Sequence, residues 1–508
     1  MQRNEVIQTY INLLAEALQI LTQYSETELS MSKAAEEYAG TYDYVSRQFK
    51  EAKDKDATAL LGAISGLICK MNDAESNVKV IYAEAISLCM DQLIDYTDRQ
   101  NIWENGRFCL FDMVPIQNDR PYIRKVPLND NWKEVGVCII PRFPVSKAET
   151  HVASELKERS LSGRNMLYGI NGDLINIGYY PWKKDTPNVC HVILSDRVLP
   201  GEQGFPSKTC ITFSPISDGT NFLQIENKSN TKIGSFNCTG IYVNGINNAE
   251  LLNTRYAMSW EKACSVSPDV FFAPEMIATD EMVGIENCGS KYLKPLLKKI
   301  AMEGKRPPRL TIMPTYWRNR KNKLLVFDET GGYVGEQLKR IAFVDEKHNV
   351  AEALIIPPES TDVLMIHLKN QQRIAFAICA EYLLGNEEYV SNFLCKKLGA
   401  TLVLVPSYSK GEQDFLSLIS AVKKYGTSVM WGNCCGAVGA KDDEHMERII
   451  GACSYAGADA IHRFGDKKQC NSSCAETNCC VFCVEIPTHV LQDKPGSMPM
   501  PEIRHLCE

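Results

Sequence analysis

An apolar run ends abruptly in a cysteine and then an acid at Arg373-Ile374-Ala375-Phe376-Ala377-Ile378-Cys379-Ala380-Glu381. A helical pattern follows: Asn386 suits an N-cap, acidic residues stand at 387–388, and basic residues at 396–397. The pattern predicts that Cys379 lies at a turn between a strand and a helix. Such a turn lifts a side chain off the edge of a parallel sheet and leaves nearby backbone N–H groups free, as a nucleophile requires.

A cysteine after an apolar run is more often a buried thiol that closes a core strand. The turn therefore does not identify a nucleophile by itself, and the rest of the chain must supply a base and a partner for the developing charge.

Length, composition and charge describe a globular protein of several domains. The chain has 508 residues, too many for one ordinary core, and is 44% hydrophobic and 23% charged. A net charge of −7 gives no overall electrostatic signature of a nucleic-acid-binding protein, so direct nucleic-acid binding is not indicated.

Targeting signals are not evident in the sequence. The N-terminus lacks the order of charges and apolar residues of a signal peptide, and no apolar run reaches the length of a membrane span. We therefore expect a cytoplasmic protein without membrane association. The 20 cysteines are expected to be mostly reduced thiols.

The spacing of apolar residues changes along the sequence and predicts a chain of several modules. Residues 1–103 repeat apolar positions at helical spacing and predict a bundle of about four helices, a kind of module that can bind a protein partner. Residues 104–232 read as a β-rich segment of unknown role, without a chemical motif. Residues 233–490 alternate strands with helices and predict a layered α/β domain, followed by a tail at 491–508.

Two further residues in the α/β domain stand at element ends. The buried strand predicted at 269–273 ends in Pro274-Glu275, which presents a carboxylate at the carboxyl end of a strand. A hairpin predicted over 324–338 ends next to Lys339. Each feature alone is commonplace, because acids and lysines often cap strands at the surface.

Taken in order, strand-Pro-Glu275, hairpin-Lys339 and strand-Cys379-helix resemble the nitrilase or carbon–nitrogen hydrolase superfamily. Further pieces match the family's pattern at Gly399 to Tyr408, in the helix and strand from Ala421 to Gly436, and in Gly451-Ala452-Cys453-Ser454. The resemblance covers about residues 233–490. It implies an α-β-β-α sandwich that pairs into a homo-oligomer through this domain.

The resemblance also implies roles for the three residues. Cys379 is the nucleophile and Glu275 the base that takes its proton. Lys339 and the backbone N–H of Ala380 stabilise the charge on the attacked carbonyl or nitrile, and one such donor contributes about 3 kcal/mol. Glu275 then passes its proton to the leaving amine and activates water against the thioester.

Family members often carry a second glutamate between the lysine and the cysteine. The candidates are Glu346, Glu352 and Glu359, and spacing does not choose among them; we take Glu352 as the supporting residue. The family frequently has an aromatic residue and an acid after the cysteine, whereas this chain has Ala380-Glu381. The small alanine leaves the backbone donor in place but removes an aromatic substrate contact.

Two other arrangements of side chains compete with this one. A Cys–His pair has a candidate in His367, which stands inside an apolar run and reads as a satisfied core histidine. Zinc has candidate ligands in Cys470, Cys474, Cys479, Cys480 and Cys483, whose spacing departs from paired C-x2-C knuckles. We predict neither a metal nor another cofactor.

The sequence thus predicts a thiol-dependent hydrolase of a non-peptide carbon–nitrogen bond. A linear amide is the expected substrate, and a nitrile, a carbamoyl compound or acyl transfer stays open. The alternative is a nitrilase-fold scaffold or ligand sensor that oligomerises in a larger assembly, for example an antiviral defence system with a reverse transcriptase partner. The long extension before residue 233 motivates that alternative, because a small amidase does not need it.

Overall fold

The structure is a computed structural model. It describes residues 3–24, 26–33, 36–93, 116–117, 120–126, 136–141, 174, 177–181, 187, 189–194, 208–216, 222–233, 236–284, 290–357, 362–368, 372–409, 413–422, 425, 427–437, 449–455, 461–466, 480–487 and 501–506. Contacts divide the chain into two compact units. Unit 1 holds Met1–Val198, His367–Gln371 and Lys396–Gly399, and unit 2 holds Leu199–Ile366, Gln372–Cys395 and Ala400–Glu508.

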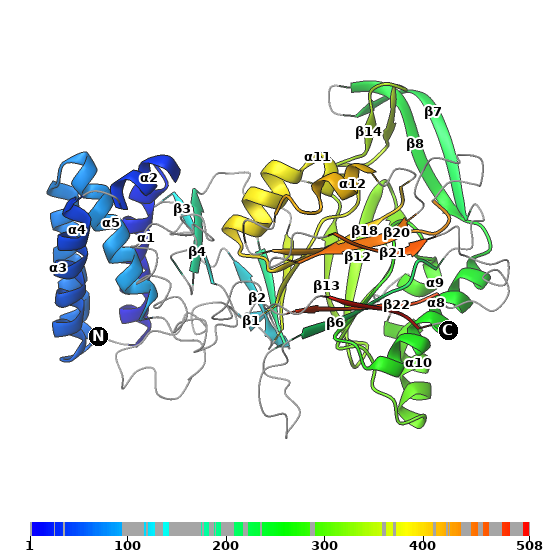
Figure 1. Cartoon of the computed structure of the whole chain (residues 1–508), viewed down its shortest axis with the longest axis horizontal. Coiled ribbons are helices and arrows are strands. Elements are labelled where there is room, and N and C mark those ends of the chain that lie inside the picture. The colour runs from blue at the N-terminus through cyan, green and yellow to red at the C-terminus, as the bar shows by residue number, and fades with distance from the viewer. Residues whose placement is uncertain are drawn as a thin grey trace. The chain divides into compact units, whose positions relative to one another are not determined.

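Unit 1 begins with a helical bundle (Figure 1). Its helices are α1 (Arg3–Leu21), α2 (Glu26–Lys33), α3 (Glu36–Lys53), α4 (Ala57–Asp73) and α5 (Ser76–Asp91). The described part has five helices where about four were expected. Helix α5 lies at the centre of the bundle, because its residues from Ala83 to Asp91 are all buried. Asp56 caps α4 by accepting a hydrogen bond from the N–H of Ala59 at 2.7 Å.

Five described strands follow the bundle in unit 1. Strands β1 (Ile116–Gln117), β2 (Arg120–Val126) and β5 (Val189–Ile193) are antiparallel neighbours, and β3 (Val137–Pro141) pairs with β4 (Ile177–Pro181).

Unit 2 contains a sheet with strand order β16-β17-β18-β19-β20-β21. The strands are β16 (Val363–His367, the last residue of which groups with unit 1), β17 (Arg373–Phe376), β18 (Leu402–Ser407), β19 (Ser428–Asn433), β20 (Ile449–Ser454) and β21 (His462–Asp466). Strands β17, β18 and β19 run parallel, β20 pairs antiparallel with β19, and β21 pairs antiparallel with β20. The carboxyl ends of the three parallel strands therefore meet at one edge of the sheet.

A second sheet of unit 2 has the order β11-β12-β10-β9-β6-β22-β23, with β13 beside β12. Its strands are β6 (Lys208–Phe213), β9 (Val270–Phe272), β10 (Leu310–Ile312), β11 (Tyr316–Arg318), β12 (Lys321–Asp328), β13 (Tyr333–Leu338), β22 (Phe482–Pro487) and β23 (Glu502–His505). The predicted hairpin is confirmed, because β12 and β13 pair antiparallel.

The two sheets pack on each other through aromatic side chains. The ring of Phe213 on β6 lies 4.7 Å from that of Phe272 on β9 and 6.3 Å from that of Phe464 on β21, centroid to centroid. Gly432 on β19 lets Phe213 approach, since a Cβ at this position would lie 2.5 Å from the ring. The core of unit 2 therefore depends on close contact between the sheets.

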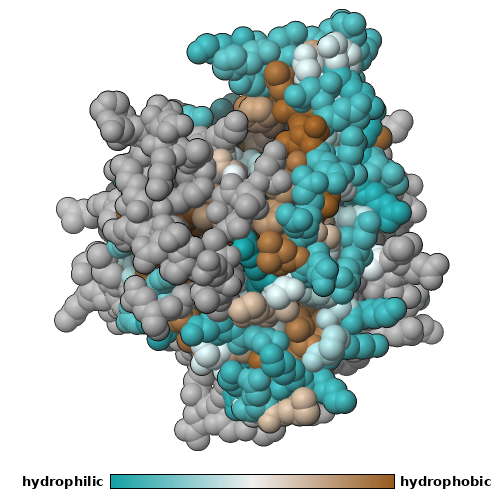
Figure 2. All heavy atoms as spheres, turned by 90° about the vertical axis from the view of Figure 1, so that its right-hand side faces the viewer, coloured by the Kyte–Doolittle hydropathy of each residue, from teal (hydrophilic) through white to brown (hydrophobic). Residues whose placement is uncertain are grey.

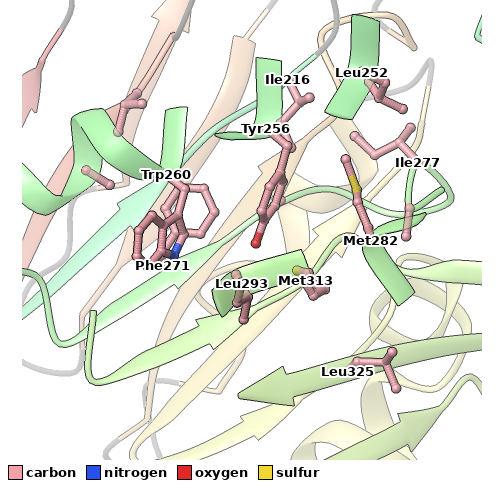
Figure 3. Close-up of a cluster of buried hydrophobic side chains, with 14 of the residues drawn as sticks. Ile216, Leu252, Tyr256, Trp260, Phe271, Ile277, Met282, Leu293, Met313 and Leu325 are labelled. Carbon is pink, nitrogen blue, oxygen red and sulfur yellow. The ribbon is translucent and has the colours of Figure 1, made fainter. Parts of the chain in front are cut away.

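Helices cover the outer faces of both sheets. Helix α8 (Ala249–Ala263) packs on the second sheet, where the indole N–H of Trp260 donates to Thr311 on β10 at 2.9 Å. Figure 3 shows Trp260 and Tyr256 of this helix in the buried cluster that continues into Leu293 of α10 (Ser290–Met302). On the first sheet, α11 (Ala380–Leu384) and α12 (Gln413–Leu418) lie over one face (Figure 1).

A smaller sheet of unit 2 has the order β14-β15-β8-β7. Its strands are β7 (Leu223–Ile233), β8 (Phe236–Ile246), β14 (Val344–Asp345) and β15 (Val350–Glu352). Residues 224–230 of β7 are all exposed. The upper edge of the molecule in Figure 2, where β7 and β8 lie, is mostly hydrophilic.

Three expectations from the sequence need correction. The helix predicted from Asn386 is present as Asn386–Lys397, but it is π-helical, and a short helix that the pattern does not predict, α11, precedes it at Ala380–Leu384. The predicted tail contains β23, which pairs with β22. Strand β6, from the predicted β-rich segment, is a central strand of unit 2. The boundaries predicted at residues 103, 232 and 490 otherwise stay predictions.

Among the described helices, none is both long enough and apolar enough to cross a membrane. The described cysteines are all free thiols.

Gly432→Ala is expected to destabilise unit 2 by about 1–3 kcal/mol, because the added methyl group would collide with the buried Phe213 ring. Gly62→Ala in α4 is the matched control. Its Cβ would meet no atom within 4 Å, and alanine favours a helix over glycine by about 1 kcal/mol. Urea unfolding of both variants measures the free energies. A Gly432→Ala variant with an unchanged free energy of unfolding would contradict the close approach of the two sheets.

Candidate active site

Cys379 lies in the turn that follows β17, immediately before α11. Its backbone has φ 48° and ψ −104°, a region that non-glycine residues rarely adopt, and holding it costs about 1–3 kcal/mol. The Cys379 N–H donates to the carbonyl of Pro406 on β18 at 3.0 Å. The side chain is buried, with 6% of the residue exposed. The turn predicted from the sequence is therefore present and strained.

Glu275 follows β9 and Pro274, and it is fully buried. Its Oε1 accepts hydrogen bonds from Lys339 Nζ at 2.7 Å and from Asn322 Nδ2 at 2.8 Å. Its Oε2 accepts one from the backbone N–H of Tyr408 at 3.2 Å. Three donors thus fix the orientation of this carboxylate.

Lys339 directly follows β13 and is also buried. Its ammonium bridges two carboxylates, with Nζ 2.7 Å from Glu275 Oε1 and 2.7 Å from Glu352 Oε2. Glu352 ends β15, and its Oε2 also accepts from the backbone N–H of Phe343 at 3.0 Å. The ends of three strands, β9, β13 and β15, therefore meet at one ammonium.

Burial and neighbouring charges shift the pKa values of Glu275, Lys339 and Cys379, partly in opposite directions. Burial raises the pKa of Glu275, the Lys339 ammonium opposes that rise, and Glu352 adds to it. Burial alone would lower the pKa of Lys339, but the two carboxylates raise it above its ordinary value, so the lysine stays charged. Burial raises the pKa of the Cys379 thiol and the Glu275 charge adds to that rise, against the opposing effect of Lys339. The resting cysteine is therefore a thiol, which needs a base to become a nucleophile.

The end of β18 connects the base to the cysteine. Pro406 accepts the N–H of Cys379, and the next carbonyl, that of Ser407, accepts the N–H of Glu275 at 3.4 Å. The N–H of Tyr408 then donates to the Glu275 carboxylate. Backbone hydrogen bonds at three successive residues thus hold both segments at the carboxyl edge of the parallel strands, where α/β sheets bind ligands.

Of the other predicted residues, Glu352 contacts Lys339, whereas Glu346 is exposed and Glu359 lies outside the described residues. Ala380 is fully buried at the start of α11. Asn322 was not anticipated, because it contacts Glu275 only through the fold, as a residue of β12 next to Lys339.

Glu381 follows Ala380 and was noted in the sequence only as an acid after the cysteine. It is fully buried. Its Oε2 accepts the N–H of Ile378 at 2.6 Å, and its Oε1 accepts the N–H of Arg340. Both oxygens of this carboxylate therefore accept backbone N–H groups, one from the residue before Cys379 and one from the residue after Lys339.

The residues of the alternative Cys–His pair and of the zinc site are only partly described. His367 is fully buried, and its Nε2 lies 2.7 Å from Nδ1 of His191. Cys483 Sγ lies 3.5 Å from Cys210 Sγ, and Cys480 Sγ lies 3.4 Å from His505 Nε2. Cys470, Cys474 and Cys479 fall outside the described residues. Within the part of the chain that is described, no group of three or more His, Cys, Asp and Glu side chains is arranged to hold a metal ion.

Comparison with known proteins gives structural similarity alone. No protein-family model and no curated protein matches the chain. The structure is similar to that of an amidase from Nesterenkonia sp., with a TM-score of 0.33 and 11% identity, over 57% of this chain and 94% of the amidase. It is also similar to a mutant of the Nesterenkonia AN1 amidase from the nitrilase superfamily, with a TM-score of 0.34 and 11% identity, over 56% of this chain and 94% of that one. A double mutant of the amidase in complex with acrylamide gives a TM-score of 0.33 and 10% identity, over 58% and 97% of the two chains.

Proposed function

We propose that this chain is a hydrolase of the nitrilase type that cleaves a linear amide through a covalent acyl-enzyme on Cys379. The observation that carries the proposal is the buried ammonium of Lys339 between Glu275 and Glu352, next to the strained cysteine turn. Buried ion clusters are a poor source of stability, because the desolvation of charges offsets their attraction. A catalytic role explains why such a cluster is retained beside a buried thiol.

In the first step, Glu275 takes the proton of the Cys379 thiol while sulfur attacks the amide carbon. The carbon–oxygen double bond opens, and the oxygen takes the electron pair. Lys339 is the cation that stabilises this oxyanion, together with the backbone N–H of Ala380, and one such donor contributes about 3 kcal/mol. Glu275 then gives its proton to the nitrogen. The carbonyl re-forms as the carbon–nitrogen bond breaks, ammonia or an amine leaves, and the acyl group stays on Cys379 as a thioester.

In the second step, Glu275 takes a proton from water as the water oxygen attacks the thioester. The carbon–sulfur bond breaks, the proton returns to sulfur, and a carboxylic acid leaves. The raised pKa of Glu275 suits both steps, because a group that alternates between base and acid works best with a pKa near the working pH.

Two buried acceptors beside the ion cluster would suit a substrate that carries N–H donors. Asn322 Oδ1 and Glu352 Oε1 make no hydrogen bond to any described residue, although their side chains contact Glu275 and Lys339. A buried acceptor without a donor costs about 1–3 kcal/mol. An amide brings N–H donors that can satisfy such acceptors, whereas a nitrile brings none.

The proposal extends to the architecture and to partners. We propose that the helices and the two large sheets of unit 2 form the α-β-β-α sandwich of nitrilases, and that the protein is a homo-oligomer. A protein partner for the helical bundle of unit 1 belongs to the same proposal.

Ammonia release from a panel of small linear amides tests the function. The chain is expected to release ammonia from at least one of them, and Cys379→Ala is expected to lower kcat by at least about 1,000-fold, because the nucleophile is lost. Cys69→Ala, which changes an exposed cysteine of α4, is the matched control and should retain full activity. Turnover that survives Cys379→Ala would contradict the proposal.

The pH profile of kcat/KM tests the role of Glu275. A base acts only when it is ionised, so activity should fall as the pH drops through the pKa of Glu275. Because burial raises that pKa, the acid limb should lie above about 4.3, the ordinary value of a glutamate. Glu275→Gln should lower kcat by about 100-fold or more, and the exposed Glu346→Gln should not. An acid limb at or below the ordinary value would exclude this assignment.

A further inference from the structure

Glu381 joins the two segments that carry the cysteine and the lysine. Its carboxylate accepts the backbone N–H of Ile378, the residue before Cys379, and the backbone N–H of Arg340, the residue after Lys339. The two donors are 38 residues apart in the sequence (378 against 340) and meet at one side chain that is fully buried. Nothing in the amide mechanism above uses this carboxylate.

We propose that Glu381 is a positioning residue that clamps the Cys379 turn to the Lys339 segment through these two backbone hydrogen bonds. The inference rests on the proposed function for its catalytic consequence, whereas the clamp itself is a property of the fold. The clamp fixes the position of the nucleophile Cys379 relative to Lys339, the cation that stabilises the oxyanion in the proposed mechanism.

The strained backbone of Cys379 requires such support. A non-glycine residue at φ 48° persists only where its surroundings over-determine it. Within the turn, the N–H of Glu381 donates to Ile378 O at 3.1 Å and that of Tyr382 to Cys379 O at 2.9 Å. These bonds close the turn on itself, but neither reaches Lys339. The Glu381 side chain supplies that missing connection.

Lys339 is fixed from the opposite side by its own backbone. Its N–H donates to the carbonyl of Asn322 on β12 at 2.9 Å, in register with the β12–β13 pairing that ends at Leu338. At Arg340 the chain leaves the sheet, and the next backbone donor goes to Glu381. The clamp therefore acts where β-sheet pairing stops holding the lysine segment.

Glu381 serves this purpose only as a carboxylate. An ionised carboxylate accepts at both oxygens, whereas a protonated acid or an amide presents a donor to one of the two N–H groups. Burial raises the pKa of Glu381 to about 7, against the N–H groups of Ile378 and Arg340 and the positive charges of Lys339 and Arg340, which lower it. The charge of Glu381 in turn adds to the rise that burial causes in the pKa of the Tyr389 hydroxyl. At pH 8 the clamp is expected to be mostly ionised.

Glu381→Gln is the test, because it keeps the shape of the side chain and replaces one acceptor by a donor. Glu387→Gln is the matched control, since Glu387 is exposed in the segment that follows Gly385. At pH 8, backbone amide exchange followed by mass spectrometry should become at least about 10-fold faster in the peptides that contain Ile378 and Arg340. With the amide found above, kcat should fall about 10- to 100-fold, whereas KM should stay within about threefold. The control should change none of these.

The outcomes separate the clamp from the proposed function. The clamp would be overturned if Glu381→Gln left the exchange rates of the two peptides and the kcat all within twofold of the wild-type values. Accelerated exchange in a protein that hydrolyses no amide would support the clamp and reject the proposed function. If Glu381→Gln does not fold, wild-type exchange still decides, because Ile378 and Arg340 amides that exchange as fast as exposed loop amides cannot be held by a buried carboxylate.

Discussion

The buried ammonium of Lys339 is the constraint on which the site depends. It lies between Glu275 and Glu352, and all three side chains are almost completely buried. Removing one partner of such a cluster strands a charge in the interior and costs about 3–5 kcal/mol. The ends of β9, β13 and β15 are therefore held together by electrostatics at a point where none of the three strands continues.

Packing in unit 2 brings these strand ends to the cysteine. The second sheet supplies Glu275 and Lys339, and the first sheet supplies Cys379 at the end of β17. An aromatic column supports the cysteine side, because the Tyr382 ring of α11 lies 6.5 Å from that of Phe415, which stacks 5.0 Å from Trp431 on β19. Sheet packing thus sets the coarse position of each group, and hydrogen bonds at the end of β18 and at Glu381 set the fine position.

The sequence predicts those parts of the site that local patterns encode. Apolar runs that end in Pro274-Glu275 and in Cys379 are visible as buried strands, and the β12–β13 hairpin predicts the place of Lys339. The helical segment at Asn386–Lys397 is predictable from its N-cap residue and its charged ends, whereas the short helix α11 before it is not, because a cysteine is a poor N-cap residue. Here the strained turn and the contacts of Glu381 override the local preference. Strand β23 was missed because four residues gain strand structure only by pairing with β22.

Contacts between side chains and distant backbone cannot be predicted from one sequence. Asn322 and Glu381 are ordinary polar residues in the chain, and only the fold brings Asn322 to Glu275 and Glu381 to Arg340. Spacing likewise does not choose Glu352 from the three glutamates after Lys339, whereas its contact with the ammonium does. Burial next to a charged partner is the physical signal that distinguishes them, and it exists only in three dimensions.

The proposed mechanism requires a covalent bond between Cys379 and its substrate. The most direct measurement is the intact mass of the chain after rapid acid quenching during turnover of a hydrolysed amide, followed by peptide mapping. We expect an added acyl group on the peptide that contains Cys379, and none on the Cys379→Ala variant. Turnover without any acyl group on this cysteine, or with the acyl group on another residue, would contradict it.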